Sequence, residues 1–235
     1  MSGPYRMFGA SVRGPGHVRA GLPNQDAFLT FSGNISSGVV LSDGLGSCRL
    51  SDRGAKAVCC SVVSEMQKVD SSRCFDGETF VAEVLKRYCA SIDVDSYAEY
   101  MATCLWGFVP GDGNVYLGML GDGLASILLS SGEVLCLEDD KKDSFSNIVV
   151  SMSPRVKYSD WKIVSVPEEL VSAVLLCSDG VSDDMTEVSG FIKEFVSEYA
   201  VGEVREHEIS EMLEAWPVPM HTDDKTIVCL ARRGL

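Results

Sequence analysis

Residues 38–46 are Gly38-Val-Val-Leu-Ser-Asp-Gly-Leu-Gly46, and this segment constrains the fold more than any other. A short apolar run ends in a carboxylate that is followed at once by a glycine. The pattern predicts a buried strand that delivers Asp43 to the edge of a sheet. Gly44 then allows the backbone to turn sharply, so that its own carbonyl oxygen can become a ligand.

The same pattern occurs twice more in the chain. Val174-Leu-Leu-Cys-Ser-Asp-Gly180 contains Asp179, and Leu117-Gly-Met-Leu-Gly-Asp-Gly123 contains Asp122. Three strands that each offer a carboxylate before a glycine indicate a site for hard divalent cations, which prefer oxygen ligands. Bound metal would compensate part of the net charge of −14, although a solvated acidic surface also explains such a charge. The same charge argues against a nucleic-acid backbone as partner.

Length and composition indicate one globular domain over residues 1–235. The hydrophobic share is 46% and the charged share 23%, as in soluble proteins with a substantial core. No apolar run reaches the ~20 residues that cross a bilayer, and the N-terminus does not resemble a secretory signal. The nine cysteines include no Cys-x-x-Cys spacing, and several lie in apolar runs. We therefore expect reduced core thiols, no zinc site, no membrane association and a cytoplasmic location.

Hydrophobic periodicity predicts many strands, with one pair of helices early in the chain and another pair late. The expected strands are residues 7–12, 26–32, 38–42, 104–109, 115–120, 125–129, 134–137, 148–152, 161–166, 174–178 and 226–231. The expected helices are residues 55–69, 80–92, 188–199 and 209–215, with Ser51 as a candidate cap of the first. Residues 11–24 are expected to form a glycine-rich loop, and the charge run 139–143 a solvated loop.

This distribution predicts an α+β fold, a four-layer α-β-β-α sandwich in which two antiparallel sheets are flanked by helices. An aspartate at the end of any one strand is often only a turn former. Several in series are much less easily explained by turns alone.

The order of the motifs resembles that of the metal-dependent type 2C protein phosphatases. Five segments carry the resemblance: Asn24-Gln-Asp-Ala27, Val40-Leu-Ser-Asp-Gly-Leu-Gly46, Leu120-Gly-Asp-Gly-Leu-Ala125, Leu176-Cys-Ser-Asp-Gly-Val-Ser-Asp183 and Asp223-Asp-Lys-Thr-Ile-Val228. Each alone is weak evidence, but all five occur in the family's order and span nearly the whole chain. The family's fold, a β-sandwich flanked by helices, agrees with the fold expected from periodicity.

The resemblance implies a centre of two Mg²⁺ or Mn²⁺ ions at one end of the sandwich. Asp43 would bridge the two ions, and the Gly44 carbonyl would bind one of them. Asp179 and Asp223 would complete the shell of the other ion. Ligands that are all oxygen, together with retained waters, suit Mg²⁺ or Mn²⁺ rather than zinc.

Two further aspartates have implied roles at this centre. Asp26 would hold metal-bound waters or touch a metal directly, and Asp122 would help Asp179 to hold a third, weaker ion. A water between two cations roughly 3.5–4 Å apart loses its proton more easily and attacks phosphorus in line with the serine or threonine oxygen. Asp26, Asp43, Asp179 and Asp223 would act in catalysis through this water, without a phospho-enzyme.

Several positions depart from the family's usual residues. Gln25 replaces a glutamate found in many members, which removes one carboxylate near the second metal. Leu45 stands where animal members have a histidine proposed as general acid. His17 is a candidate acid for this chain, but we favour its alternative role as a hydrogen-bond partner that stabilises the loop. Arg19 and Arg13 are candidates for gripping the substrate phosphate, because guanidinium suits phosphate oxygens.

We therefore expect a phosphatase of phosphoserine and phosphothreonine in proteins that stands alone and opposes a serine/threonine kinase. The alternative is a catalytically silent pseudophosphatase that binds partners. Among the motif residues, only Gln25 favours this alternative. A calcium-binding or purely structural sandwich would rest on acidity alone, and no twelve-residue calcium loop is present. The pattern contains no heptads and leaves the oligomeric state open.

Overall fold

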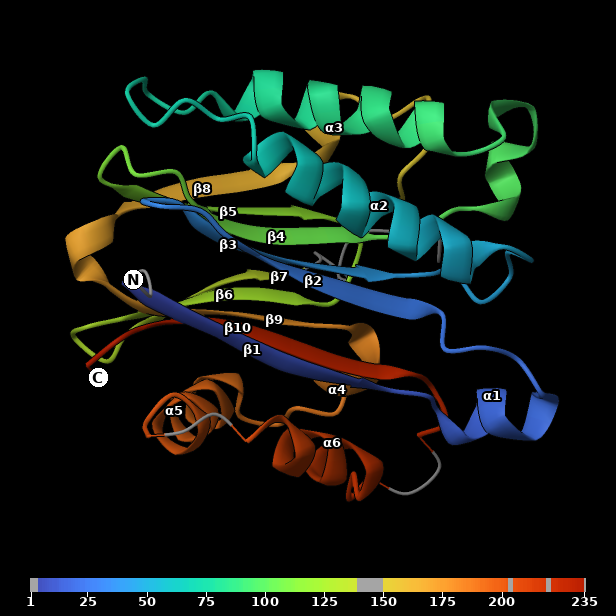
Figure 1. Ribbon diagram of the computed structural model, residues 1–235. Helices are drawn as coiled ribbons and strands as arrows, with labels where there is room; N and C mark the ends of the chain where they lie inside the picture. Colours follow the sequence, from blue (N-terminus) through green and yellow to red (C-terminus); the bar gives the residue numbers. More distant parts are fainter. Residues whose placement is uncertain (1–3, 139–149, 203–204, 219–220, 235) are drawn as a thin grey trace.

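Two antiparallel sheets of five strands face each other, and helices cover their outer faces (Figure 1). The computed structural model describes residues 4–138, 150–202, 205–218 and 221–234. The α-β-β-α sandwich expected from the sequence is confirmed. The charge run at residues 139–143 lies outside the described residues.

Neighbouring strands in both sheets are antiparallel. The first sheet has the order β1 (Tyr5–Val12), β10 (Lys225–Arg232), β9 (Val171–Cys177), β6 (Leu124–Leu129) and β7 (Val134–Glu138). The second has the order β2 (Asp26–Ser32), β3 (Ser37–Asp43), β4 (Cys104–Val109), β5 (Asn114–Leu120) and β8 (Lys162–Pro167). The connection from β5 to β6 crosses between the sheets and contains Asp122.

The helices lie in two outer layers and at one end of the sandwich. Helices α2 (Ser51–Met66) and α3 (Gly77–Ser91) cover the second sheet, and α5 (Val188–Tyr199) and α6 (Glu206–Glu214) cover the first. Two short helices, α1 (Pro15–Ala20) and α4 (Asp179–Ser182), follow β1 and β9, and three 3-10 turns occupy Val94–Glu99, Tyr158–Asp160 and Glu168–Leu170. None of the helices in the described segments combines the length and apolar character that a bilayer span requires.

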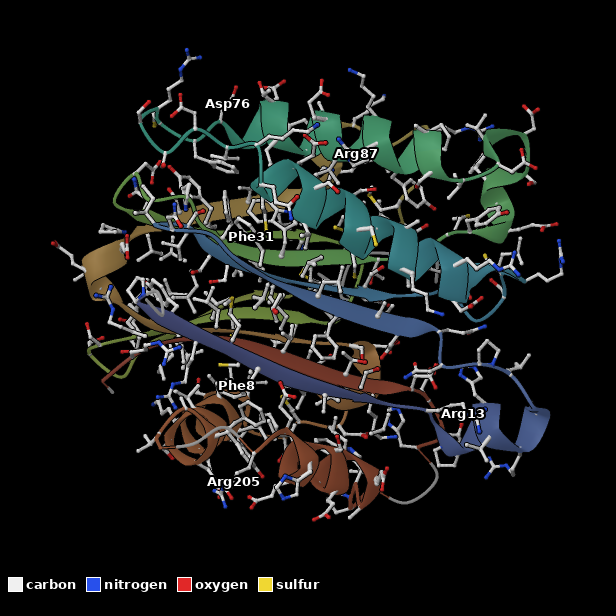
Figure 2. The ribbon with its side chains drawn as sticks, in the orientation of Figure 1. Phe8, Arg13, Phe31, Asp76, Arg87 and Arg205 are labelled. Carbon is white, nitrogen blue, oxygen red and sulfur yellow. The ribbon has the colours of Figure 1, made fainter. Side chains whose placement is uncertain are left out.

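Three apolar clusters hold the layers together, one between the sheets and one under each helical layer. Strand β10 shows how the pattern arises, because Ile227 and Cys229 face α5 and α6 while Val228 and Leu230 face the other sheet. A strand buried on both faces needs apolar residues at successive positions, which explains its continuous apolar run. Figure 2 labels Phe8 in the cluster under α5 and α6, where its ring stacks on that of Phe195.

The loop expected at residues 11–24 contains the short helix α1. Pro15 begins this helix, and Gly21 ends it with a left-handed φ of 69°. Proline at the first position and glycine after the last are the usual helix boundary residues, so the sequence carried a signal for this helix. The prediction of a continuous loop was wrong.

Two other local predictions need correction. Ser51 is the first residue of α2 rather than its cap, since Leu50 holds the cap position and no side chain caps it. Residues 148–149 of the strand expected at 148–152 lie outside the described residues, and residues 150–152 are not a strand. Met152 donates one backbone hydrogen bond to Ala102. A single bond of this kind does not make a strand ladder.

Candidate metal centre

Strand ends from both sheets bring the predicted aspartates to one edge of the sandwich. Asp26 begins β2, Asp43 ends β3, and the two residues are register partners. Asp179 follows β9, and Asp223 precedes β10, which pairs with β9. The charges of Asp26, Asp179 and Asp223 all act on the carboxyl group of Asp43 and raise its pKa, so the four side chains lie close together. The structure therefore gathers these four carboxylates, although each comes from a different strand end.

Asp122 lies at the same edge. Leu124, the first residue of β6, pairs with Cys177, the last residue of β9. Asp122 lies two residues before Leu124 and Asp179 two residues after Cys177, so both follow the same end of this antiparallel pair. A Cβ atom added to Gly123 would lie 3.7 Å from the backbone nitrogen of Asp179. The position agrees with the arrangement implied for a third ion, and its role stays a prediction.

The cluster places more negative charge in a buried site than protein donors neutralise. Burial is the main factor that raises the pKa of Asp26 to about 7, and repulsion from Asp224 and Asp179 adds to it. Burial, followed by the charges of Asp26 and Asp179, raises the pKa of Asp43 well above its usual range. Burial of the Asp223 carboxyl group and the charge of Asp179 also raise its pKa, although the residue as a whole is exposed. Carboxylates in such surroundings either take up protons or bind cations.

Unpaired oxygen atoms show that the carboxylates fit a divalent cation. Oδ1 of Asp26 and Oδ1 of Asp179 are buried and accept no hydrogen bond. Oε1 of Gln25 is in the same state. Buried oxygens without donors are costly unless an ion or water satisfies them, and oxygen ligands suit Mg²⁺ or Mn²⁺. The donor set therefore suits the ions that the resemblance implies.

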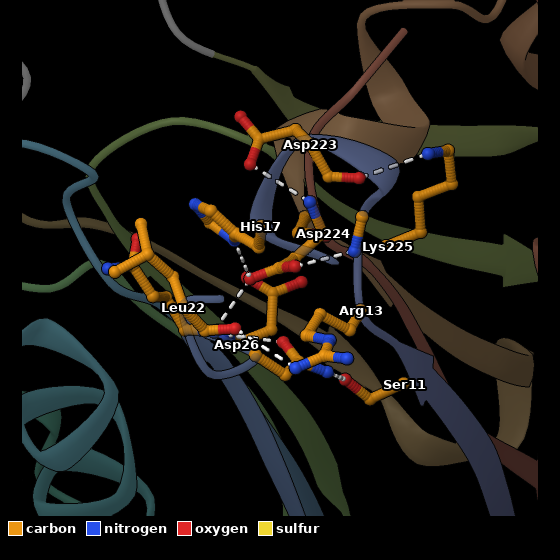
Figure 3. A network of polar contacts seen from close by, with 12 residues as sticks. Ser11, Arg13, His17, Leu22, Asp26, Asp223, Asp224 and Lys225 are labelled. Carbon is orange, nitrogen blue, oxygen red and sulfur yellow. Dashed lines mark hydrogen bonds and ion pairs between the residues drawn. The ribbon is translucent and has the colours of Figure 1, made fainter. Parts of the chain in front are cut away.

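Asp224 was not among the predicted site residues, but it organises the loops around the cluster (Figure 3). Only 2% of it is exposed. Its Oδ1 accepts from the backbone N–H of Gly14 at 2.7 Å. Its Oδ2 accepts from the N–H of Gln25 at 2.6 Å and from His17 Nδ1 at 2.8 Å. One carboxylate thus ties the loop after β1, helix α1 and the start of β2 to the start of β10.

The nitrogen of His17 and carboxylate oxygens of Asp223 and Asp224 lie within 4.8 Å of one another, close enough to suggest a metal site. The hydrogen bonds argue otherwise, because both oxygens of Asp224 already accept from protein donors. An ionised carboxylate only accepts, so His17 carries its proton on Nδ1. This contact matches the hydrogen-bonding role that we favoured for His17. Among the described residues, only the N–H of Asp224 donates to Oδ1 of Asp223, at 2.9 Å, so Asp223 is the better ligand.

Further polar contacts beside the cluster, all missed by the sequence analysis, fix the strand ends that carry the carboxylates. The Thr226 hydroxyl of β10 donates to Oδ2 of Asp26 at 2.7 Å, which links one sheet to the other. The N–H of Asp43 donates to Thr103 Oγ1 at 2.9 Å. Lys225, only 3% exposed, donates to the carbonyl of Asp223 at 3.0 Å. The sequence feature that could have identified Thr226 is its position in the last motif, three residues after Asp223.

Close packing, rather than an unusual backbone conformation, explains the glycines that follow two of the aspartates. The φ of Gly44 is not in the left-handed region, but a Cβ atom there would lie 2.8 Å from the carbonyl oxygen of Gln25. At Gly180 an added Cβ atom would lie 1.9 Å from the carbonyl oxygen of Asp224. Only glycine allows these segments to approach so closely. The expectation from the sequence that Gly44 is needed for a sharp turn is therefore corrected.

The two candidate phosphate-binding arginines lie on the segment around α1. The guanidinium of Arg13 donates to the carbonyl of Leu22 at 3.1 Å (Figure 3). Arg19 belongs to α1 and is exposed. Both can be reached from solvent, and their role in binding phosphate stays a prediction.

A family model described as protein phosphatase 2C matches residues 13–216. The chain belongs to the protein phosphatase 2C family. The matched range contains four of the five segments that carry the resemblance in the sequence, and the Asp223 segment lies just beyond it. No curated protein matches the chain.

Solved structures of phosphatases share this protein phosphatase 2C fold. A bacterial serine phosphatase is 17% identical, with a TM-score of 0.70 and 98% of each chain covered. The serine/threonine phosphatase Stp1 from Staphylococcus aureus is also 17% identical, with a TM-score of 0.66, 100% of this chain and 96% of that chain covered. RsbX, solved in complex with magnesium, is 14% identical, with a TM-score of 0.62, 97% of this chain and 95% of that chain covered. At these identities the likeness establishes the fold alone.

Proposed function

We propose that this chain is a metal-dependent protein phosphatase that hydrolyses phosphoserine and phosphothreonine. The observation that carries the proposal is the convergence of Asp26, Asp43, Asp179 and Asp223 on one edge of the sandwich, with two of their oxygens buried and unpaired. Membership of the protein phosphatase 2C family and the serine phosphatases among its structural relatives support it.

In this proposal the carboxylates hold two Mn²⁺ or Mg²⁺ ions. Asp43, Asp179 and Asp223 are the main ligands, with Asp26 beside them and the Gly44 carbonyl as a further oxygen. Such ions, when bound, supply a water that is more easily deprotonated and neutralise charge on the phosphoryl oxygens. Asp122 and Asp179 are the proposed ligands of a third ion.

The chain's own residues would position the substrate and manage its protons. Asp224 holds the N–H of Gln25 and so sets the position of Asp26 at the start of β2. Thr226 holds Oδ2 of Asp26, which leaves Oδ1 for the ion or its waters. Arg13 and Arg19 are the candidates for binding phosphate. Since Leu45 cannot donate a proton, the leaving oxygen must take its proton from another source, and His17, whose Nδ1 is bound to Asp224, is the weaker candidate.

The test is hydrolysis of a phosphothreonine peptide in Mn²⁺, in Mg²⁺ and in EDTA. We expect activity only with metal, and we expect Asp179→Asn to lower kcat by about two to three orders of magnitude, the scale for loss of one electrostatic catalytic group. Glu133→Gln is the control, because this exposed residue precedes β7 at the opposite end of the sheet. Metal binding by calorimetry without hydrolysis would instead support the pseudophosphatase, with Gln25 and Leu45 as the first positions to examine.

The substrates that we propose are phosphoproteins, modified by a serine/threonine kinase that this enzyme would oppose. We propose a cytoplasmic location on the same grounds as in the sequence analysis, the reduced cysteines. None of the nine cysteines forms a disulfide bond with another.

A further inference from the structure

A concave feature lies on the outer layer of the first sheet, between α5, α6 and the segment that follows α4. It has a volume of about 540 Å³. Its apolar wall is made by Met185, Phe191, Met212 and Trp216, each of which is partly exposed. The rings of Phe191 and Trp216 meet edge to face, with centroids 6.1 Å apart. We call this feature the α5–α6 groove. Partly exposed aromatic and methionine side chains of this kind can accept an apolar side chain of a partner.

The rim of the α5–α6 groove is acidic. Glu187, Glu194 and Glu198 line it, and no lysine or arginine is among the described residues that do so. Glu194 and Glu198 are four residues apart on α5, a spacing at which like charges repel and destabilise a helix slightly. Lys193, the single basic residue of α5, does not line the groove. Glu187 caps α5 by accepting from the N–H of Gly190. The groove therefore combines an apolar wall with the charges of Glu194 and Glu198, which no lysine or arginine of its described lining neutralises.

One residue connects the α5–α6 groove to the candidate metal centre. Asp184 lines the groove and follows Asp179 by five residues. Its Oδ2 accepts from Trp216 Nε1 at 2.8 Å and from His221 Nδ1 at 2.5 Å. Trp216 belongs to the groove, while His221 precedes Asp223 by two residues. The groove therefore shares a hydrogen-bonded side chain with the segment that leads to Asp223.

We propose that the α5–α6 groove docks a basic amphipathic segment of the phosphoprotein substrate, one that lies apart from the phosphorylated residue. This inference rests on the proposed function and adds a substrate class to it. A large apolar side chain would enter between Phe191, Met212 and Trp216. Lysine or arginine side chains beside it would face Glu187, Glu194 and Glu198. The pairing follows from charge complementarity, which favours partner choice and encounter.

The same charges disfavour other occupants. A second copy of this chain carries a net charge of −14, so it would be repelled by an acidic rim. A basic peptide is attracted to both the rim and the whole molecule. The segment that fits this groove therefore carries both positive and apolar side chains.

Binding can be tested without catalysis, using an unphosphorylated synthetic peptide rich in leucine and arginine. Two matched peptides replace every arginine by glutamate or every leucine by serine. Calorimetry measures affinity, and fluorescence of Trp216 reports the site, because Trp106 and Trp161 are buried. We expect the first peptide to bind and both matched peptides to bind at least tenfold more weakly. Equal binding of the three peptides, or no binding of the first, would overturn the proposal.

Charge removal tests the position of the peptide. The double variant Glu194→Gln/Glu198→Gln should weaken binding about threefold to tenfold, the range for two exposed ion pairs. The matched control is Glu211→Gln/Glu214→Gln, which removes two exposed charges from α6 outside the groove and should leave the affinity unchanged. An equal effect of both double variants, or a second copy of the chain found in the groove by crosslinking, contradicts the proposal.

Catalysis gives a separate test. A phosphothreonine peptide with the leucine- and arginine-rich segment appended should have a KM at least fivefold lower than the same peptide without it. This advantage should persist in the Glu211→Gln/Glu214→Gln control and disappear in Glu194→Gln/Glu198→Gln. If neither peptide is hydrolysed, the proposed function fails, but the calorimetric binding test still shows whether the groove docks a basic amphipathic peptide. If both are hydrolysed with the same KM, the docking proposal fails and the function stands.

Discussion

Asp223 and Asp224 are neighbours in sequence, but their carboxylates stand in opposite situations. Asp224 is buried and accepts from Gly14, Gln25 and His17. Asp223 is exposed and, within the described parts of the chain, accepts only the backbone N–H of Asp224. The first carboxylate is committed to holding loops in place, whereas the second is available to a ligand.

This contrast predicts different effects of two alanine variants. Asp224→Ala should lower the free energy of unfolding by about 2–4 kcal/mol, because three hydrogen bonds are lost and buried donors remain unpaired. Asp223→Ala should change it by less than about 0.5 kcal/mol in EDTA, as expected for a surface site. Hydrolysis with metal should be lost in Asp223→Ala. Urea unfolding in EDTA measures both, and equal stability losses would contradict the assignment.

At the scale of elements, the first turns of α2 pack against the segment before β4. The N–H of Leu50 donates to Glu99 and that of Leu45 to Met101, so this segment fixes the loop that follows Asp43. Gly54 in α2 makes the approach possible, since an added Cβ atom would lie 1.8 Å from the carbonyl oxygen of Tyr100. The position of the loop that follows Asp43 thus depends on a glycine in helix α2.

Two glycine substitutions separate this packing effect from helix propensity. Alanine favours a helix by about 1 kcal/mol over glycine, but overpacking against a backbone oxygen costs more. Gly54→Ala should therefore lower the free energy of unfolding by about 2–3 kcal/mol. At Gly190 in α5 the added atom would meet only the flexible end of Glu187, so Gly190→Ala should be within about 1 kcal/mol of neutral. Thermal unfolding compares the two, and similar losses would refute the packing argument.

For the molecule as a whole, the carboxylate cluster is a junction between the two sheets. Asp26 and Asp43 belong to one sheet, while Asp179 and Asp223 adjoin strands of the other. A shared cation would hold the sheets together at this edge, whereas ionised carboxylates without one repel each other. Global stability should therefore depend on metal and on pH.

The pKa of Asp26, raised to about 7, sets the direction of this pH dependence in the metal-free protein. In the unfolded chain this carboxyl group loses its proton near pH 4, roughly the ordinary value for an aspartate. Between about pH 4 and pH 7 the folded state therefore binds more protons than the unfolded state. Stability should therefore fall as pH rises from about 5 to about 8 in EDTA. Saturating Mn²⁺ at about 100 Kd should restore about 2.7 kcal/mol. Calorimetric Tm values across this range measure the slope, and Asp26→Asn should flatten it; a rising slope in EDTA would contradict the prediction.

The periodicity predicted ten of the strands and four of the helices, because a strand or helix with one buried face carries its pattern in adjacent residues. Short elements were harder. Helix α1 has six residues and none is buried, so it lacks an apolar pattern and only Pro15 and Gly21 marked it. Ser51 looked like a cap by residue type alone, yet its hydroxyl is buried without a partner. Such details depend on what packs beside the segment.

The order of carboxylate and glycine motifs, and with it the family and the set of aspartates, was determined by the sequence alone, since each motif is local. The tertiary structure decided which of the neighbours Asp223 and Asp224 uses its carboxylate to hold loops in place. Gly14 and Asp224, which are 210 residues apart, share a hydrogen bond. It also decided that Thr226 reaches Asp26 across the sheets and that an acidic, apolar groove forms between α5 and α6. Burial and hydrogen-bond partners come from segments distant in the chain, and no local pattern records them.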